Sequence, residues 1–168
     1  MAKKATSFMK KKGKGFIKIW KSRRKDSTFE TEAWTDGSIL VMNGYREFNF
    51  PPGCYYYDGE TGLIQPRKKS DFPNFKEVIP KSKGYHKAEI VTEYNLLKLL
   101  KKYDGRLIVM LKGKGKDVKA FLDYEYYQYL TDRGYSGYSW KVKGKEDPIL
   151  FYVGKEKAAV VMPFRVED

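Results

Sequence analysis

The chain contains very little of the chemistry that builds metal, thiol or catalytic-triad sites. Among its 168 residues there is one cysteine, Cys54, and one histidine, His86. A lone cysteine cannot close an internal disulfide, so nothing in the sequence indicates an oxidising compartment. One cysteine and one histidine cannot complete a zinc site, and no Ser-His-Asp pattern is present. We therefore expect a non-catalytic protein with no metal and no cofactor.

Long apolar runs are also absent. No stretch approaches the roughly 20 apolar residues of a membrane-spanning helix, and the first 25 residues lack the apolar centre of a secretory signal. The sequence therefore predicts a cytoplasmic protein with no membrane partner. The segment KGKGK at residues 112–116 lacks the spacing of a nucleotide-binding phosphate loop. We interpret it as a basic hairpin turn that either contacts phosphate or is simply solvated.

Acidic residues are missing from one end of the chain. The net charge is +13, and residues 1–25 hold 11 basic residues with no aspartate or glutamate, whereas the rest has 23 basic and 21 acidic residues. Such a segment attracts a polyanion by counterion release, so we expect DNA binding that weakens steeply with salt; the alternative is a solvated tail. The expected DNA contacts in this segment are Lys3, Lys4, Lys10, Lys11, Lys12, Lys14, Lys18, Lys21, Arg23, Arg24 and Lys25.

Short alternating segments between turn residues predict a fold rich in strands. After a basic arm at residues 1–15, the predicted strands are 16–21, 28–34, 38–42, 45–50, 55–58, 62–65, 87–91, 106–112, 139–143, 149–153 and 158–163. Residues 66–87 contain Pro66, Pro73 and Pro80, which exclude a long helix and make this segment the best linker candidate.

Two further segments have helical features. Thr92 can cap a helix from Glu93 to about Tyr103, and Lys98, Lys101 and Lys102 cluster on one side of it. Residues 117–134 fit a helix between a cap at Asp117 and a stop at Gly134, but their tyrosines favour a strand, so both interpretations stay open.

Many aromatic residues gather between residues 124 and 140. They either fill the core or stack on single-stranded bases, and Tyr135, Tyr138 and Trp140 are the best candidates for exposed rings because they lie in a Gly-Ser-rich segment. One enzyme-like pattern is also present. Asp104 and Asp117, with Lys119 nearby, can hold Mg²⁺ and position a water, as a metal-dependent nuclease requires, although both aspartates also suit turns or caps.

Three segments, taken in order, resemble one known family. They are Thr35-Asp36-Gly37 after a predicted strand, the run FPNFKEVIPK at residues 72–81, and Val160-Val161-Met162-Pro163-Phe164-Arg165 near the C-terminus. Together they resemble the bacterial DNA sliding clamp, the ring-forming β subunit of the replicative polymerase. The resemblance covers roughly residues 28–112 and 148–166, with an insertion at 113–147.

The resemblance implies an α+β fold, namely a clamp-like domain at residues 16–168 that is built from two βαβββ halves, mostly antiparallel sheet with helices on one face. It also implies that Lys98, Lys101 and Lys102 face DNA. A pocket formed by Val161, Met162, Pro163 and Phe164 would then receive peptides from replication proteins.

The chain departs from that family in size and charge. Bacterial clamps carry three such domains and are acidic, whereas this chain holds one and is strongly basic, so a closed ring would require about six copies as a homo-oligomer. We therefore expect a single-domain relative, from a phage or mobile element, that binds DNA in replication. The alternatives are a peptide-binding adaptor for replication proteins and a metal-dependent nuclease.

Overall fold

The computed structural model describes residues 3–4, 15–20, 30–35, 39–44, 53–58, 60–61, 63–68, 75–91, 107–132 and 136–166. The chain divides into two compact units, Met1–Ile79 and Pro80–Asp168. The division falls inside the proline-containing segment 66–87, the linker candidate, and within the range 16–168 that the sequence treats as one domain. In the described residues of both units antiparallel strands dominate, so the predicted α+β class with mostly antiparallel sheet is confirmed.

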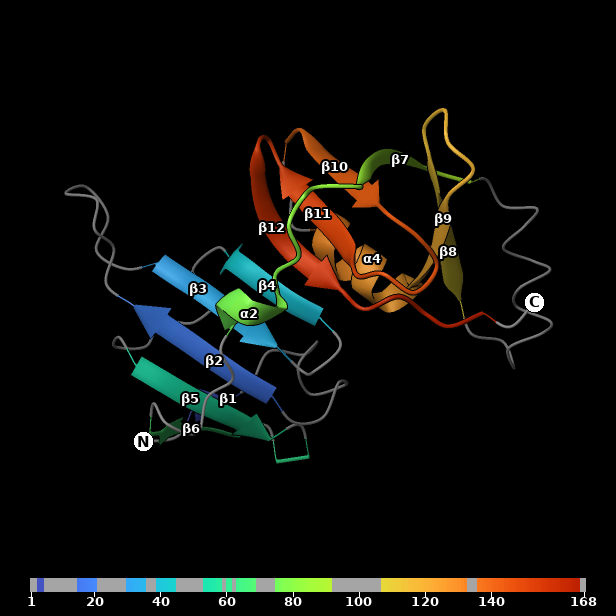
Figure 1. Ribbon diagram of the computed structural model, residues 1–168. Coiled ribbons are helices and arrows are strands. Elements are labelled where there is room, and N and C mark those ends of the chain that lie inside the picture. Colours follow the sequence, from blue (N-terminus) through green and yellow to red (C-terminus); the bar gives the residue numbers. More distant parts are fainter. Residues whose placement is uncertain are drawn as a thin grey trace. The chain divides into compact units, whose positions relative to one another are not determined.

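Unit 1 is an antiparallel sheet (Figure 1). Its strands are β1 (Lys3–Lys4), β2 (Gly15–Trp20), β3 (Glu30–Thr35), β4 (Ile39–Gly44), β5 (Gly53–Asp58) and β6 (Leu63–Arg67), and a short helix, α2 (Phe75–Val78), follows them. The order across the sheet is β1-β6-β5-β2-β3-β4. Three consecutive residues of β4, Ile39, Leu40 and Val41, and Ile64 of β6 are buried.

The basic N-terminal segment takes part in this sheet. Strand β2, whose sequence GFIKIW alternates, pairs with β5 on one side and β3 on the other. Lys18 therefore belongs to an interior strand of unit 1. Lys3 and Lys4, expected in an arm at residues 1–15, pair through their backbone with Ile64 and Leu63. Backbone pairing does not depend on an apolar side chain, which is why composition did not reveal this strand.

The described residues of unit 2 form two three-stranded meanders. Its elements are β7 (His86–Ile90), β8 (Ile108–Gly113), β9 (Lys119–Asp123), α4 (Tyr124–Thr131), β10 (Tyr138–Val142), β11 (Ile149–Val153) and β12 (Glu156–Val161). The sheet order β12-β11-β10-β7-β8-β9 places each meander on one side of an antiparallel β7–β10 pair. Helix α4 packs against β8 and β9 (Figure 1).

The ambiguous segment 117–134 contains both a strand and a helix. Residues 119–123 form β9, and the helix begins only after Asp123, whose side chain accepts a hydrogen bond from the Glu125 backbone N–H at 2.9 Å. The predicted cap at Asp117 is therefore wrong, because a neighbouring strand, β8, offers residues 119–123 a full backbone ladder. Segment 113–147, an insertion by the resemblance, supplies β9, α4 and β10 and is integral to unit 2.

Part of the core of unit 2 lies between the sheet and α4. Tyr126 and Leu130, four residues apart on α4, are buried together with Leu122 of β9 and Phe151 of β11. The Trp140 and Phe151 rings lie 4.6 Å apart between centroids, within the usual range for aromatic pairs. Trp140 was expected to be exposed, but it is 97% covered because β10 is an interior strand flanked by β7 and β11.

The core assignment can be tested with two leucines of the same unit. Leu122 is 0% exposed and Leu107 is 45% exposed. We expect Leu122→Ala to lower the free energy of unfolding by about 2–5 kcal/mol, since it removes buried methyl groups and leaves a cavity. Leu107→Ala makes the same chemical change at the surface and should cost less than about 1 kcal/mol. Urea unfolding followed by circular dichroism measures both, and equal losses would contradict the described core.

Candidate nucleic-acid interface

The two faces of the unit 2 sheet can be assigned from one aromatic contact. Tyr127 of α4 stacks on Trp140 of β10, with 5.9 Å between ring centroids, so Trp140 points towards the helix. Side chains alternate along a strand, and the next residue, Lys141, therefore points to the opposite face. Directly opposite Lys141 in the neighbouring strand β7 is Lys87, which shares that face.

The same face continues across β8 and β9. Glu89, two residues after Lys87, lies opposite Lys112 of β8, and Lys112 lies opposite Lys119 of β9. Lys114, two residues after Lys112, reaches back to Glu89, and its Nζ lies 3.1 Å from the Glu89 Oε1. We call the set Lys87, Lys112, Lys114, Lys119 and Lys141 the lysine face.

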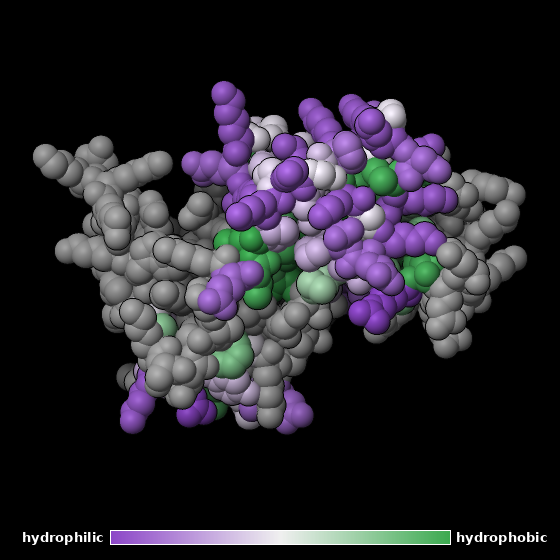
Figure 2. Space-filling view, viewed as in Figure 1, coloured by the Kyte–Doolittle hydropathy of each residue, from purple (hydrophilic) through white to green (hydrophobic). Residues whose placement is uncertain are grey.

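Solvent reaches most of the lysine face. All of its lysines are exposed except Lys141, which is half-buried because its ammonium lies 4.3 Å from the centre of the Tyr152 ring. Two carboxylates share this side with the five lysines: Glu89 lies opposite Lys112 and pairs with Lys114, and Asp123 caps α4. Figure 2 shows hydrophilic side chains gathered over this unit. The face therefore carries a net positive charge.

This arrangement is electrostatically unfavourable for the isolated fold. Two pairs of lysines, Lys87 with Lys141 and Lys112 with Lys119, stand directly opposite each other in adjacent antiparallel strands. Like charges at such positions, with Cβ atoms about 5 Å apart, destabilise a sheet. Salt screens part of the repulsion, and a bound polyanion removes it. The face is thus suited to a partner with closely spaced negative charges.

Most of the DNA contacts expected from the sequence fall outside the described residues. These are Lys10, Lys11, Lys12, Lys14, Lys21, Arg23, Arg24, Lys25, Lys98, Lys101 and Lys102. Lys3, Lys4 and Lys18 are described as parts of β1 and β2 in unit 1. The sequence singled out two parts of the lysine face: Lys119, as a neighbour of Asp117, and the segment KGKGK. The latter is confirmed as the β8–β9 turn, in which the Gly113 N–H donates to the Val118 carbonyl at 2.8 Å.

The expected peptide pocket lies at the end of β12. Val161 is 0% exposed, so its side chain is not presented to a ligand, whereas the next residue, Met162, is 49% exposed. Pro163 and Phe164 are half-buried, and the Phe164 N–H donates to the Phe121 carbonyl at 2.7 Å. This hydrogen bond holds the segment against β9. Met162 is the most exposed apolar side chain of the segment.

Two classes of candidate remain, the aromatic residues for base stacking and the aspartates for a metal ion. Tyr138 is 39% exposed and lies 5.5 Å from Phe151, between ring centroids, whereas Tyr135 and Asp104 lie outside the described residues. Asp117 is exposed in the β8–β9 turn. In the described part of the chain, no three His, Cys, Asp or Glu side chains are grouped to hold a metal ion.

Helix length gives one further result. Among the helices of the described segments, none has the length and apolar character needed to cross a lipid bilayer.

The lysine face was missed by sequence reasoning because it is not local. Lys87 and Lys141 are far apart in the chain and meet only through the β7–β10 pair. A partial signal was present: lysines at every second position in Lys112-Gly113-Lys114 and Lys141-Val142-Lys143 are typical of a strand with one cationic face. No protein-family model, curated protein or solved structure matches the chain.

The repulsion within the lysine face predicts a gain in stability when it is relieved. We expect Lys119→Gln to raise the free energy of unfolding at low salt by up to about 1 kcal/mol, because Lys112 then loses its like-charged neighbour. In about 1 M salt the gain should vanish, since screening acts over about 3 Å. Urea unfolding at both salt concentrations measures it. Lys155→Gln, a substitution in the exposed β11–β12 turn, is the control and should give no gain.

Proposed function

We propose that this protein binds nucleic acid, with DNA as the expected partner, through the lysine face of unit 2 and without catalysing a reaction on it. The observation that carries the proposal is the pair of cross-strand lysine contacts, Lys87 with Lys141 and Lys112 with Lys119. A sheet that only needed to be soluble would gain stability from alternating charges at these positions.

The spacing of the lysines suits a phosphate backbone. Neighbouring strands lie about 4.8 Å apart, and alternate residues along one strand lie about 6.6 Å apart. Phosphates follow each other at about 3.4 Å of axial rise along each strand of a duplex. A group of cations spread over four strands therefore meets several phosphates at once, and each contact releases counterions that favour binding.

The chemistry of the face supports binding that is indifferent to base sequence. Lysine acts as a compact point charge, whereas sequence is read mainly by planar groups and paired hydrogen bonds at base edges. The basic residues before Asp26 add to the same attraction. We extend the proposal to them as a second cationic segment that increases affinity without adding specificity.

A clamp-like role in DNA replication is the more specific form of this proposal. It is supported by the order of elements in unit 2, where β9, α4, β10, β11 and β12 form one βαβββ run. A helix at residues 93–103 would give the other meander a helix of its own, but that segment lies outside the described residues. In such a domain Lys98, Lys101 and Lys102 would supply further phosphate contacts, and Met162 would offer replication proteins an apolar contact.

The salt dependence of binding tests the lysine face directly. We expect the triple variant Lys87→Gln, Lys112→Gln and Lys119→Gln to flatten the slope of log affinity against log salt by roughly 2–3, since each lost phosphate contact removes about 0.7–0.9. Fluorescence anisotropy with a labelled duplex and with a labelled single strand measures the slope over a salt series.

The matched control removes the same charge elsewhere. Lys68→Gln, Lys155→Gln and Arg165→Gln replace three exposed cations that lie outside the lysine face. If the protein bound polyanions only through its overall charge, both triple variants would flatten the slope equally. That result would contradict the lysine face as the interface.

A further inference from the structure

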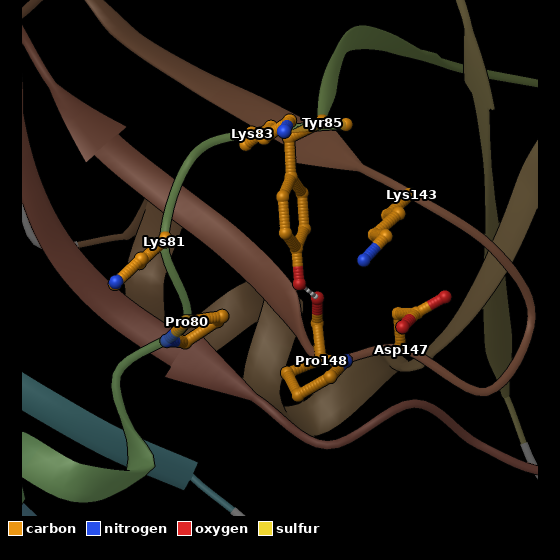
Figure 3. Close-up of a pocket in the computed structure, with 8 residues that line it drawn as sticks. Pro80, Lys81, Lys83, Tyr85, Lys143, Asp147 and Pro148 are labelled. Atoms are coloured by element: carbon orange, nitrogen blue, oxygen red, sulfur yellow. Dashed lines mark hydrogen bonds between the residues drawn. The ribbon is translucent and has the colours of Figure 1, made fainter.

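A cavity opens beside the lysine face, between the segment that leads into β7 and the segment that follows β10. Its volume is about 450 Å³, which is within the range of small-molecule sites. Figure 3 shows the ring of Tyr85 standing in the middle of its lining, with Pro80 and Lys81 on one side and Lys143 and Asp147 on the other.

The segment 80–85 that forms one wall has little regular structure, yet hydrogen bonds hold it in place. The Tyr85 hydroxyl donates to the Pro148 carbonyl at 2.8 Å, and Lys157 Nζ donates to the Pro80 carbonyl at 2.8 Å. The hydroxyls of Ser82 and Tyr152 lie 2.8 Å apart in a third hydrogen bond. These contacts fix the wall before any ligand binds, which lowers the ordering cost of binding.

Gly84 shapes the same wall. Its backbone has φ of +83°, a conformation that other residues rarely adopt. A Cβ at this position would lie 3.2 Å from the Lys143 Cε, so the absence of a side chain lets the Lys143 chain cross close over the backbone. The turn therefore brings a cation from the end of β10 to the cavity.

The lining combines cations with flat apolar surfaces. Lys81, Lys83 and Lys143 line the cavity with one carboxylate, Asp147, and Pro80, Pro148 and the Tyr85 ring supply the apolar walls. Burial, with smaller contributions from Asp147 and Tyr152, raises the pKa of Tyr85 to about 12. The phenol therefore stays protonated at neutral pH and keeps its hydrogen bond to Pro148.

Two connections join the cavity to the lysine face. Lys143 follows Lys141 by two residues at the end of β10. The Lys141 ammonium lies over the Tyr152 ring, and the Tyr152 hydroxyl is hydrogen-bonded to the Ser82 hydroxyl in the cavity wall. A nucleic-acid strand that lies on the lysine face therefore passes from Lys141 to Lys143 at the edge of the cavity.

We propose that this cavity accepts one unpaired nucleotide, whose base lies against the Tyr85 ring while its phosphate contacts Lys143. The inference rests on the proposed function, because the lysine face delivers the strand. It adds a preference: the protein favours nucleic acid with an unpaired nucleotide over a fully paired duplex. The same chemistry would also admit a free nucleoside monophosphate.

The experiment compares two labelled DNA hairpins on the full chain by fluorescence anisotropy. Both carry one overhanging nucleotide, which is adenine in one hairpin and abasic in the other, so their phosphate charges are equal. We expect the adenine overhang to bind roughly tenfold more tightly or better, as base–aromatic stacking implies. Equal affinities would overturn the cavity while leaving the lysine face intact, whereas no binding of either hairpin would overturn the proposed function itself.

A pair of variants tests whether the tighter binding of the adenine overhang depends on the cavity. Tyr85→Leu keeps an apolar side chain but removes the aromatic face and the hydroxyl that bonds to Pro148, and it should abolish the advantage of the adenine overhang over the abasic hairpin. Tyr138→Leu changes an exposed ring outside the cavity lining and should keep the advantage. An advantage that survives Tyr85→Leu, or is lost only in Tyr138→Leu, would overturn the assignment. The hairpin comparison on the unmodified chain remains valid if a variant does not fold.

Competition with adenosine 5′-monophosphate distinguishes the two sources of the nucleotide. If it reduces the affinity for the adenine overhang to that for the abasic hairpin, the cavity also accepts free nucleotides. If the advantage persists at millimolar competitor, the cavity accepts a nucleotide only within a strand.

Discussion

The antiparallel pairing of β7 with β10 is the contact on which the architecture of unit 2 depends. It joins the β7-β8-β9 meander to the β10-β11-β12 meander, and its register sets Ala88 opposite Trp140 and Lys87 opposite Lys141. Because side chains alternate along a strand, a slip of one residue would move Trp140 away from the helix and turn Lys141 in towards it. The aromatic core against α4 thus fixes the register, and the register in turn fixes which side chains form the opposite face.

That division explains how an unfavourable charge arrangement persists. The face towards α4 buries Trp140, Phe151 and Leu122, and burial of side chains of this size contributes about 1.5–3 kcal/mol each. Two lysine pairs on the other face oppose this by at most about 1 kcal/mol each. The apolar face therefore has enough stabilisation to impose its register and to keep the lysines opposed.

The sequence predicted local elements well and the interface poorly, for a physical reason. Strand β11 was predicted with its observed bounds, and β2 and β10 within one residue at each end, since alternation and turn residues are local signals. The helix start at Asp123 was missed because the backbone ladder to β8, a tertiary contact, makes residues 119–123 a strand. The lysine face depends on which strands become neighbours, and no short stretch of sequence encodes that. The charge count therefore drew attention to residues 1–25, where the imbalance is visible along the chain.

The lysine face and the cavity would bind nucleic acid through two different kinds of interaction, phosphate attraction and base stacking. Cations on a sheet interact with any phosphate backbone, and that attraction alone cannot tell a paired strand from an unpaired one. The Tyr85 ring and the two prolines can distinguish a paired from an unpaired strand. A base stacked within a duplex presents only its edges, while an unpaired base has a free face. Since Lys143 belongs to the cavity and follows directly from the lysine face, a strand held by its phosphates would present its unpaired base at a short distance from Tyr85. Affinity would then come from the sheet, and discrimination from the segment 80–85.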